Sequence, residues 1–382
     1  MRIGIDIRTL MEKNYSGVSE YTLNLVRAIL ENDRKNEYKL FYNSGRDVRN
    51  RLPVFNYENV EIISRRYPNK IFNYFLQKIF RYPKIDKMLG VDVFWLPHLN
   101  FISLSKESKK ILTVHDLSFW RYPKFFSLRR NVWHCIINAK KLIQSADKIV
   151  AVSENTKYDI MDLAGINPSK IEVIYSGLDE QYKVMPRDDK NLALTKEKYG
   201  LKDEFVLFLA TLEPRKNIKG LIKAYSKFKK DNFWAENIDL IIVGGKGWKT
   251  GDIFGEKEKS EYKKNIKFLE YIPREEKVYL YNLASVFVYP SFYEGFGFPP
   301  LEAMACGTPV ITSSASSLPE VAGSCSLLVN PDSSEEISEA IRIVFSDKKI
   351  RDSLVEAGIK RAKELSWKKT AENYLRIFQE VN

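Results

Sequence analysis

The chain has 382 residues, of which 44% are hydrophobic and 29% charged, with 18 glycines and 15 prolines. This is the composition of an ordinary globular protein, and it excludes collagen, mucin-like stalks and long disordered tails. Lys and Arg number 61 against 49 Asp and Glu, and the net charge of +12 favours an anionic partner such as a nucleotide, a nucleic acid or a lipid headgroup. Three cysteines are too few for a disulfide framework or a cysteine-based metal site, and they indicate a reducing compartment.

The length predicts two domains with a cleft between them, because a single core stops growing at about 250–300 residues. The first residues alternate like a strand and lack the apolar core and cleavage site of a signal peptide. No apolar run approaches the roughly 20 residues that span a bilayer. We therefore expect a cytoplasmic protein without a membrane-spanning segment.

In the first half of the chain, short β-branched runs alternate with helical patterns, which predicts parallel βα units. The expected strands lie at 2–7, 38–42, 58–63, 91–95, 110–115, 147–152 and 171–174. The expected helices lie at 19–31, 70–88, 127–145 and 154–163. The predicted fold class is α/β with a doubly wound sheet, and we place this domain at residues 1–183.

The pattern restarts after a polar, charge-rich stretch at 179–203, interpreted as a linker followed by the first helix of a second Rossmann-like domain at 184–365. The expected strands lie at 205–210, 239–243, 286–289 and 309–312. The expected helices lie near 217–231, 274–284, 334–345, 347–364 and 367–380, with a short one begun by Pro299 and closed by Gly307.

The most informative segment is Ser291-Phe-Tyr-Glu-Gly-Phe-Gly-Phe-Pro-Pro-Leu-Glu302. Its two carboxylates, Glu294 and Glu302, flank a Gly-aromatic-Gly turn that follows a strand and opens a helix. Free backbone N–H groups and the helix dipole favour an anion there, and glycines permit close approach of a ligand. With Glu302 in the first helical turn, we expect the two acids to face one ligand from two sides.

This segment resembles the Glu-x7-Glu motif of glycosyltransferase family 4, whose members are retaining enzymes with the GT-B fold. The resemblance implies that Glu294 contacts the donor sugar and that the backbone of Gly295, Phe296 and Gly297 holds sugar and phosphate. It also implies that Glu302 binds the ribose hydroxyls of a nucleotide. In the fold of that family two Rossmann-like domains face a central cleft, and a last helix, here 366–382, crosses back to the first domain.

A second match is Leu209-Ala-Thr-Leu-Glu-Pro-Arg-Lys-Asn217, a strand end that opens a helix. Arg215 and Lys216 stand where two cations and free N–H groups can neutralise a diphosphate. The variant resembles the branch that contains bacterial and archaeal O-antigen mannosyltransferases. Many family members carry an Arg where this chain has Thr211, and we interpret Arg215 as its replacement.

The first domain supplies further candidates. Gly17 lies in the loop after the first strand, where the family has a Gly-rich loop near the donor phosphates. His115 and Asp116 follow a strand end and match the His-Asp of the acceptor domain, with His115 beside the donor sugar. We expect His98, after another strand end, and Asp116 to line the acceptor site. The three scattered histidines do not predict a metal site.

The resemblance implies a retaining hexosyltransferase that needs neither metal nor cofactor, since the nucleotide-sugar is a substrate. Arg215 and Lys216 would stabilise the leaving diphosphate, Glu294 would contact the sugar, and His115 would position it. The branch favours mannose from GDP-mannose, moved to a saccharide or lipid-linked saccharide in cell-surface polysaccharide synthesis. The alternative is a transferase for glucose, galactose or N-acetylglucosamine from a UDP-sugar.

Residues 61–145 hold 16 Lys and Arg against 5 Asp and Glu, together with many aromatic residues. Basic and aromatic side chains suit an anionic membrane surface, and we predict peripheral binding at the inner face of the cell membrane through Lys124, Arg129 and Arg130. Alternatively, the aromatics fill the core and the cations form a solvated face. Without a helix-turn-helix, zinc or RNA-recognition signature, we do not expect nucleic-acid binding.

Overall fold

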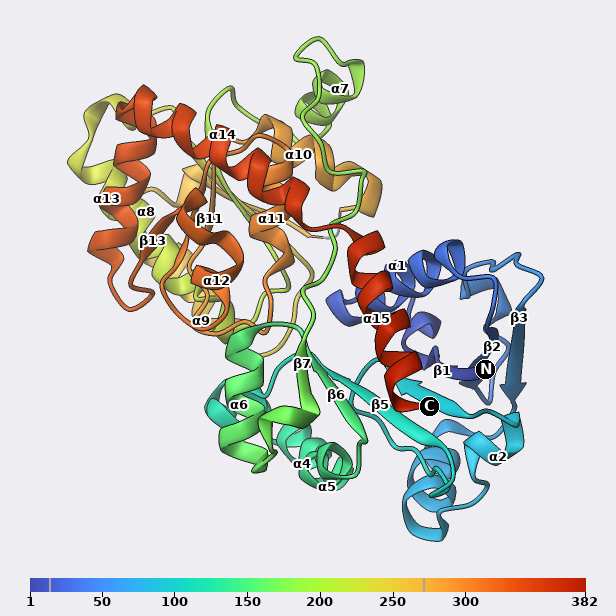
Figure 1. Cartoon of the computed structure of the whole chain (residues 1–382). Coiled ribbons are helices and arrows are strands. Elements are labelled where there is room, and N and C mark those ends of the chain that lie inside the picture. Colours follow the sequence, from blue (N-terminus) through green and yellow to red (C-terminus); the bar gives the residue numbers. More distant parts are fainter. Residues whose placement is uncertain (14, 271) are drawn as a thin grey trace. The chain divides into compact units, whose positions relative to one another are not determined.

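The computed structural model describes residues 1–13, 15–270 and 272–382, and the chain forms two compact units (Figure 1). Unit 1 contains Met1–Trp120, Arg129–Gly177 and Ser366–Asn382, and unit 2 contains Arg121–Leu128 and Leu178–Leu365. The first unit thus ends at Gly177 where the sequence suggested 183, and it includes the last helix. That Arg121–Leu128 belongs to unit 2 is not expected from the sequence.

Unit 1 is built on a parallel sheet, with seven strands among the described residues in the order β3-β2-β1-β4-β5-β6-β7. The strands are β1 (Arg2–Asp6), β2 (Glu37–Asn43), β3 (Val60–Arg65), β4 (Val93–Leu96), β5 (Lys109–Val114), β6 (Lys148–Ala151) and β7 (Ile171–Val173). Central strands such as β4 are entirely buried, because helices cover both faces of a parallel sheet. The expected strands of this half are confirmed, with small shifts at their ends.

The helices of unit 1 follow the expected positions except at two breaks and at the short helix α3, which the sequence analysis did not expect. They are α1 (Gly17–Asn32), a π-type helix (Ile71–Phe80), α2 (Ile85–Leu89), α3 (Ser118–Arg121), α4 (Leu128–Ile137), α5 (Ala139–Gln144), α6 (Glu154–Ala164) and α15 (Trp367–Val381). The helix expected at 70–88 is interrupted at Arg81 (φ 51°), and the one at 127–145 is interrupted at Asn138 (φ 56°). Both predictions were wrong because a left-handed residue ends a right-handed helix.

Helix α15 lies beside α1 (Figure 1). A chain of buried hydroxyl groups attaches it to the unit 1 sheet. The Tyr374 hydroxyl lies 2.8 Å from that of Tyr21 and 2.6 Å from Thr113 Oγ1. Trp95 Nε1 donates to the same Thr113 Oγ1 at 2.9 Å. The last helix is therefore part of the unit 1 core and is fixed there by directional bonds as well as by packing.

Unit 2 repeats the architecture with six strands among the described residues, all parallel, in the order β10-β9-β8-β11-β12-β13. They are β8 (Phe205–Leu209), β9 (Asp239–Val243), β10 (Ile266–Leu269), β11 (Val286–Tyr289), β12 (Val310–Ser313) and β13 (Leu327–Val329). The sequence did not predict the outer strands β10 and β13, because they are short and mostly half-buried or exposed, which weakens the apolar pattern.

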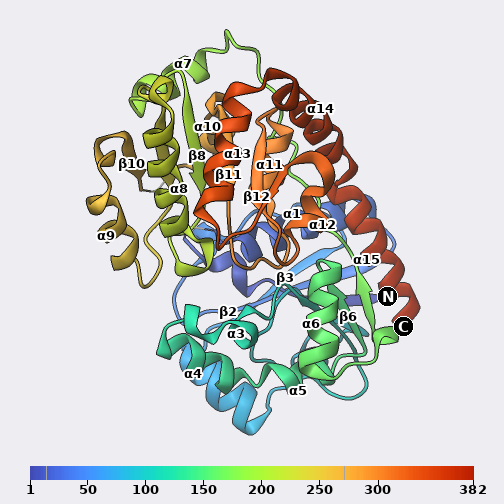
Figure 2. The same cartoon turned by 90° about the vertical axis from the view of Figure 1, so that its left-hand side faces the viewer.

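Helices cover both faces of this second sheet (Figure 2), with α8 packed on α13 and α11 packed on α14. They are α7 (Lys190–Lys198), α8 (Ile218–Asp231), α9 (Gly251–Lys259), α10 (Lys277–Leu283), α11 (Phe298–Ala305), α12 (Leu318–Ala322), α13 (Ser334–Ser346) and α14 (Lys348–Glu364). No helix in the described part of the chain is long and apolar enough to cross a membrane.

Candidate functional site

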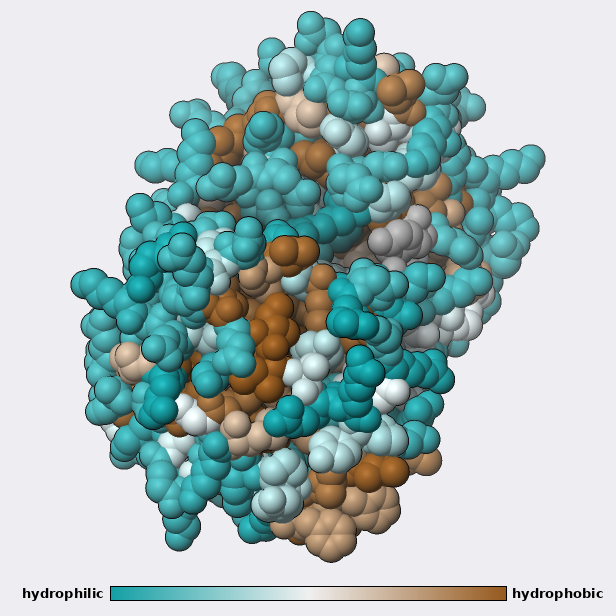
Figure 3. All heavy atoms as spheres, turned by 90° about the vertical axis from the view of Figure 1, so that its right-hand side faces the viewer, coloured by the Kyte–Doolittle hydropathy of each residue, from teal (hydrophilic) through white to brown (hydrophobic). Residues whose placement is uncertain are grey.

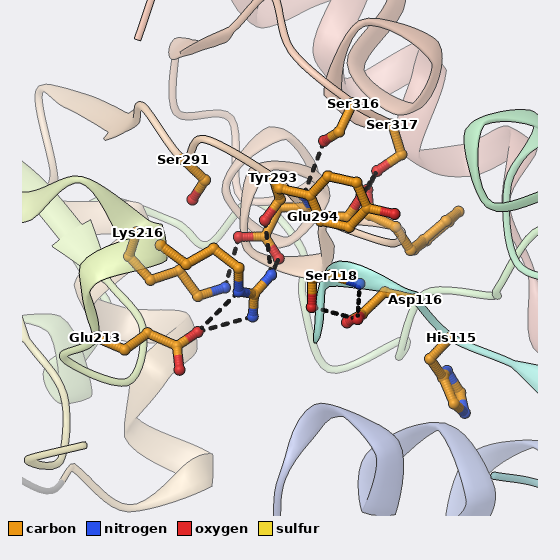
Figure 4. Close-up of polar contacts among 12 residues, drawn as sticks. His115, Asp116, Ser118, Glu213, Lys216, Ser291, Tyr293, Glu294, Ser316 and Ser317 are labelled. Atoms are coloured by element: carbon orange, nitrogen blue, oxygen red, sulfur yellow. Dashed lines mark hydrogen bonds and ion pairs between the residues drawn. The ribbon is translucent and has the colours of Figure 1, made fainter. Parts of the chain in front are cut away.

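Four charged side chains meet at the carboxyl end of the unit 2 sheet: Glu213, Arg215, Lys216 and Glu294, the charged cluster (Figure 4). The first three follow β8, and Glu294 follows the neighbouring strand β11. The strand order reverses between these two strands, and loops at such a switch point diverge and leave room for a ligand. Topology therefore brings together residues that are far apart in the sequence.

Each oxygen of Glu294 pairs with a different cation. Lys216 Nζ lies 2.6 Å from Glu294 Oε1, and Arg215 Nη1 lies 2.9 Å from Oε2. Lys216 also donates to the Tyr289 hydroxyl at 2.7 Å, and Arg215 Nη1 donates to the Tyr293 carbonyl at 2.7 Å. The structure thus unites Arg215, Lys216 and Glu294, which two separate motifs had identified.

Glu213 completes the cluster, although sequence reasoning gave it no role. Its Oε1 accepts from Arg215 Nε at 3.1 Å and from Nη2 at 2.8 Å, and its side chain is buried. The sequence signal that could have identified Glu213 is an acidic residue two positions before Arg215, in the loop after β8. Many family members carry an Arg at the position of Thr211, which is exposed here. In this chain the guanidinium group of Arg215, held by Glu213 and Glu294, lies in the cluster instead.

The charges of the cluster keep Glu294 ionised. Burial alone would raise the pKa of Glu294, but the cations of Arg215 and Lys216 lower it to about 2. Burial lowers the pKa of Lys216, as does the charge of Arg215, while Glu294 opposes that change. The formal charges of two acids and two bases cancel, so the buried site is electrically balanced.

The backbone of the turn after Glu294 is held by two serines that sequence reasoning missed. Glu294 N donates to Ser316 Oγ at 2.8 Å, and Ser317 Oγ donates to the carbonyls of Glu294 and Phe296 at 3.0 and 2.9 Å. Both serines follow β12, the strand beside β11, and precede α12. A serine pair between a strand and a helix is the sequence signal that could have found them.

Gly295, Phe296 and Gly297 form a buried turn ahead of α11. Gly297 has φ 104°, and a Cβ atom there would lie 2.7 Å from Leu318 Cδ2, so glycine is required at this position. The helix begins at Phe298, which contradicts the expected start at Pro299.

The sequence analysis expected Glu302 in the first turn of α11. This was wrong, because the helix starts at Phe298 and Glu302 therefore lies beyond its first turn. It is half-buried, and its Oε2 accepts from the Tyr281 hydroxyl at 2.7 Å. This hydrogen bond orients the carboxylate. That Glu294 and Glu302 face the same ligand stays a prediction.

At the edge of unit 1, His115 follows β5 and is oriented by a backbone carbonyl. Its Nε2 lies 2.8 Å from the Pro97 carbonyl oxygen, and its ring meets that of Tyr21 edge-on. A carbonyl oxygen can only accept, so Nε2 carries hydrogen and a neutral ring presents Nδ1 as an acceptor. Burial lowers the pKa of His115, which favours this neutral form.

His98 and Asp116 lie after the adjacent strands β4 and β5. Burial lowers the pKa of His98 to about 4, and its Nδ1 is a buried atom without a hydrogen-bond partner among the described residues. Asp116 Oδ1 accepts from the Ser118 backbone N–H at 2.9 Å and from its hydroxyl at 2.5 Å, which builds the turn into α3. Their contact with an acceptor stays a prediction.

Gly17 is the first residue of α1, directly after the capping residue Ser16. A Cβ atom added there meets no other atom within 4 Å, so packing does not require a glycine. Its approach to donor phosphates stays a prediction. Within the described ranges, no group of three or more His, Cys, Asp or Glu side chains is arranged to hold a metal ion.

Two family models match most of the chain. Residues 15–182 match Glycosyltransferase Family 4, and residues 190–361 match Glycosyl transferases group 1. O-antigen chain mannosyltransferase B of Escherichia coli is 30% identical over 92% of this chain and 93% of its own length. The serotype-specific mannosyltransferase WbdA of Escherichia coli is 30% identical over 71% of this chain but only 34% of its own length.

Solved structures show the same fold. Sucrose-phosphate synthase from Thermosynechococcus elongatus has a TM-score of 0.76 at 18% identity, covering 99% of this chain and 98% of its own. Anabaena HepE in complex with UDP-glucose has a TM-score of 0.75 at 17% identity, with both chains fully covered. The predicted α/β, GT-B architecture is confirmed. The chain belongs to the glycosyltransferases of family 4, the glycosyl transferases group 1, and is an enzyme that transfers glycosyl groups.

Proposed function

We propose that this enzyme is a retaining mannosyltransferase that uses GDP-mannose and adds mannose to a saccharide or lipid-linked saccharide during synthesis of a cell-surface polysaccharide. One observation carries the proposal: a chain 30% identical to an O-antigen mannosyltransferase over most of its length holds Arg215, Lys216 and Glu294 in one buried cluster. The reaction would take place in the cytoplasm, the reducing compartment that three unpaired cysteines indicate.

Lys216 is the group best suited to the leaving diphosphate. An ammonium group has three N–H donors, and two of those of Lys216 are used by Tyr289 and Glu294 within the described part of the chain. The third can donate to a phosphate oxygen. Because negative charge grows on the diphosphate as the glycosidic bond breaks, a fixed buried cation stabilises the transition state more than the ground state. This supports transfer without a metal ion or other cofactor.

Glu294 is suited to hold the sugar, and poorly suited to attack it. Both of its oxygens are engaged by cations, and its pKa of about 2 makes it a weak nucleophile. This supports a retaining reaction without a covalent enzyme intermediate, in which the acceptor attacks from the face that the diphosphate leaves. The leaving phosphate would then take the proton of the acceptor.

The remaining residues receive binding roles. His115, with Nδ1 as acceptor, would position a sugar hydroxyl, because a buried imidazole of lowered pKa is a weak base. Glu302, oriented by Tyr281, would bind the ribose hydroxyls, and the turn Gly295–Gly297 would hold sugar and phosphate. Gly17 would admit the phosphates, and His98 and Asp116 would line the acceptor site.

Transfer and hydrolysis assays with GDP-, UDP- and dTDP-sugars test the donor, and NMR of the product tests retention of the anomeric configuration. We expect GDP-mannose to be preferred, an α-linked product from the α-donor, and full activity in EDTA. A UDP-sugar donor is the second candidate, because a fold neighbour is a complex with UDP-glucose. Preference for UDP-glucose, or strict dependence on a divalent cation, would contradict the first proposal.

We also propose that unit 1 binds an anionic membrane surface. The helix Ile71–Phe80 exposes large apolar side chains, of which Phe80 is 68% exposed, and α4 exposes Val132 and Trp133. Phe101 joins the two helices: its ring lies 6.5 Å from that of Trp133, and Lys78 Nζ lies 5.9 Å from its centroid. Large apolar side chains gather at the lower edge of the face drawn in Figure 3.

Exposed Lys70, Arg129 and Arg130 supply the positive charge of this surface. Other aromatic residues of the region 61–145, such as the buried Phe72 and Phe119, fill the core, as the alternative interpretation of this region expected. Lys124 was grouped with these cations in the sequence analysis, but it lies in unit 2.

Sedimentation with phosphatidylglycerol vesicles at low salt tests the membrane proposal. Charge reversal at Arg129, Arg130 and Lys124, each as a single variant to Glu, should weaken binding, and comparison of Lys124→Glu with the other two shows whether the unit 2 lysine contributes as much as the unit 1 arginines. A wild type that stays in the supernatant would favour a soluble acceptor.

A further inference from the structure

The segment 121–128, here called the strap, packs in unit 2 although the residues on both sides of it in the sequence belong to unit 1. Two side chains of the loop after β9 bind its backbone. Trp248 Nε1 donates to the Phe125 carbonyl at 2.6 Å, and Lys249 Nζ donates to the Lys124 carbonyl at 2.7 Å. The strap is thus held by directional bonds at two successive peptides.

Aromatic rings extend this attachment toward the charged cluster. Phe126 stacks on Trp248 with ring centroids 5.9 Å apart. Phe125 stacks on Phe292 at 5.5 Å and an interplanar angle of 20°, and Tyr122 packs on Tyr293 at 5.6 Å. The strap therefore covers the two residues that immediately precede Glu294.

Phe292 and Tyr293, the two residues that the strap covers, both form hydrogen bonds with Arg215. Phe292 N donates to the Arg215 carbonyl at 2.9 Å, and Arg215 Nη1 donates to the Tyr293 carbonyl at 2.7 Å. A displacement of residues 292 and 293 would therefore move Arg215 and Glu294 together.

The loop that carries Trp248 is itself fixed to the strand end that carries Glu213. Leu212 N donates to the Gly245 carbonyl, and Gly247 N donates to the Leu212 carbonyl, both at 3.0 Å. A Cβ atom at Gly247 would lie 2.5 Å from the Leu212 oxygen, so the two loops touch backbone to backbone. The loop of Trp248 is thus attached by two backbone hydrogen bonds to the segment that leads to Glu213.

We propose that the strap is a positioning element for the transfer reaction, and that Trp248 and Phe125 are positioning residues that keep Arg215 and Glu294 in their reactive geometry. This inference rests on the proposed function of the charged cluster. Because reaction rates depend steeply on the placement of catalytic groups, loosening the strap should reduce kcat. Nucleotide affinity should change less than kcat, since Glu302 and Tyr281 lie on other elements and Lys216 of the diphosphate site is held by Tyr289 of β11.

Trp248→Phe keeps an aromatic ring against Phe126 but removes the N–H that binds Phe125. Trp234→Phe is the matched control: it makes the same chemical change at a side chain that is 53% exposed in unit 2. Trypsin cleavage after Lys124, followed by mass spectrometry, reports strap release without reference to activity. We expect about fivefold faster cleavage in Trp248→Phe, as for the loss of one hydrogen bond, and no change in Trp234→Phe.

Steady-state kinetics and calorimetry of nucleoside diphosphate binding complete the test. In Trp248→Phe we expect kcat to fall about tenfold or more, with donor KM and nucleoside diphosphate Kd within about twofold of wild type. A strap that is released while kcat stays unchanged would overturn this inference alone. A kcat loss accompanied by an equal loss of nucleotide affinity would indicate general damage and also overturn it. A wild type without transferase activity would overturn the proposed function as well.

Discussion

The strands β1 and β8 occupy equivalent places in the two sheets, and an acid, one other residue and an arginine occur near the carboxyl end of each. Asp6 is the last residue of β1, whereas Glu213 comes after three residues that follow the end of β8. In unit 1 the arginine of Asp6-Ile7-Arg8 pairs with Asp6 at 2.6 Å and also binds Asn73 and the Phe101 carbonyl. In unit 2 the same arrangement is followed by Lys216 and faces a second acid, Glu294.

The difference shows how one local arrangement serves structure in one unit and chemistry in the other. Arg8 is 6% exposed, and its partners tie β1 to the helix Ile71–Phe80 and to the segment at Phe101. Burial alone would raise the pKa of Asp6, yet Arg8 lowers it, as expected for a closed ion pair. The unit 2 cluster adds a cation with a donor to spare, and that donor makes it a candidate active site.

The largest effect should come from breaking the closed pair of unit 1. Arg8→Met leaves Asp6 as a buried charge without its partner, and we expect the free energy of unfolding to fall by about 3–5 kcal/mol. Urea denaturation measures it. The double variant Asp6→Asn/Arg8→Met removes the lone charge and should recover part of the loss. A single variant as stable as the wild type would show that the pair is not a structural one.

Lys216→Ala tests the opposite side of the comparison. Alanine has no positive charge to stabilise the negative charge that develops on the diphosphate, so kcat should fall about a hundredfold or more. The free energy of unfolding should change less than in Arg8→Met. The control is Lys219→Ala, an exposed lysine on the adjacent helix α8, which should leave kcat unchanged. Retention of more than a tenth of wild-type kcat would remove Lys216 from the mechanism.

The two acids of the unit 2 motif should separate binding from turnover. Glu302→Ala should weaken nucleoside diphosphate binding about tenfold to a hundredfold, because hydrogen bonds to a charged group contribute about 1.5–3 kcal/mol each. Glu294→Ala should instead reduce kcat, since its proposed partner is the sugar. Calorimetry and steady-state assays distinguish them, and Tyr281→Phe, which frees Glu302 from its hydroxyl partner, should give an intermediate nucleotide affinity. Unchanged affinity in Glu302→Ala would exclude that residue from the nucleotide site.

Sequence reasoning reached the unit 2 cluster because its motifs are short and local. Arg215, Lys216 and Glu294 each lie in a strand-to-helix connection that the apolar pattern of β8 and β11 makes visible. Glu213 and the Asp6–Arg8 pair were missed because their roles depend on which way the side chains turn within a loop. No local pattern reports that direction.

The strap marks a second limit. Phe125 and Trp248 are 123 residues apart, and no periodicity links them. The sequence analysis therefore treated the basic and aromatic residues of 61–145 as one group, whereas Phe119 packs in unit 1 and Phe126 in unit 2. The sequence analysis missed the helix breaks at Arg81 and Asn138 because an arginine gives no signal for the left-handed conformation and an asparagine gives only a weak one.

The smallest expected effect is on the pH dependence of stability, and it comes from His98, a neutral side chain near the Asp6–Arg8 pair of unit 1. Its pKa is lowered by burial to about 4 in the folded chain, whereas an unfolded histidine titrates near pH 6.5. Well above pH 6.5 both states are neutral and the full stability is present. As pH falls toward 4 the unfolded state takes up a proton that the folded state does not, so stability decreases by at most about 1.4 kcal/mol per pH unit for this residue.

His98→Asn should reduce this dependence of stability on pH between pH 7.0 and 5.5, a range above the titration of unfolded carboxyl groups. Urea denaturation of the variant and the wild type measures it. His134→Asn is the matched control: its pKa is likewise lowered by burial to about 4, and we expect a similar reduction in slope. If His98→Asn keeps the wild-type slope while His134→Asn loses it, His98 titrates normally in the folded chain and is charged beside Asp6 at low pH.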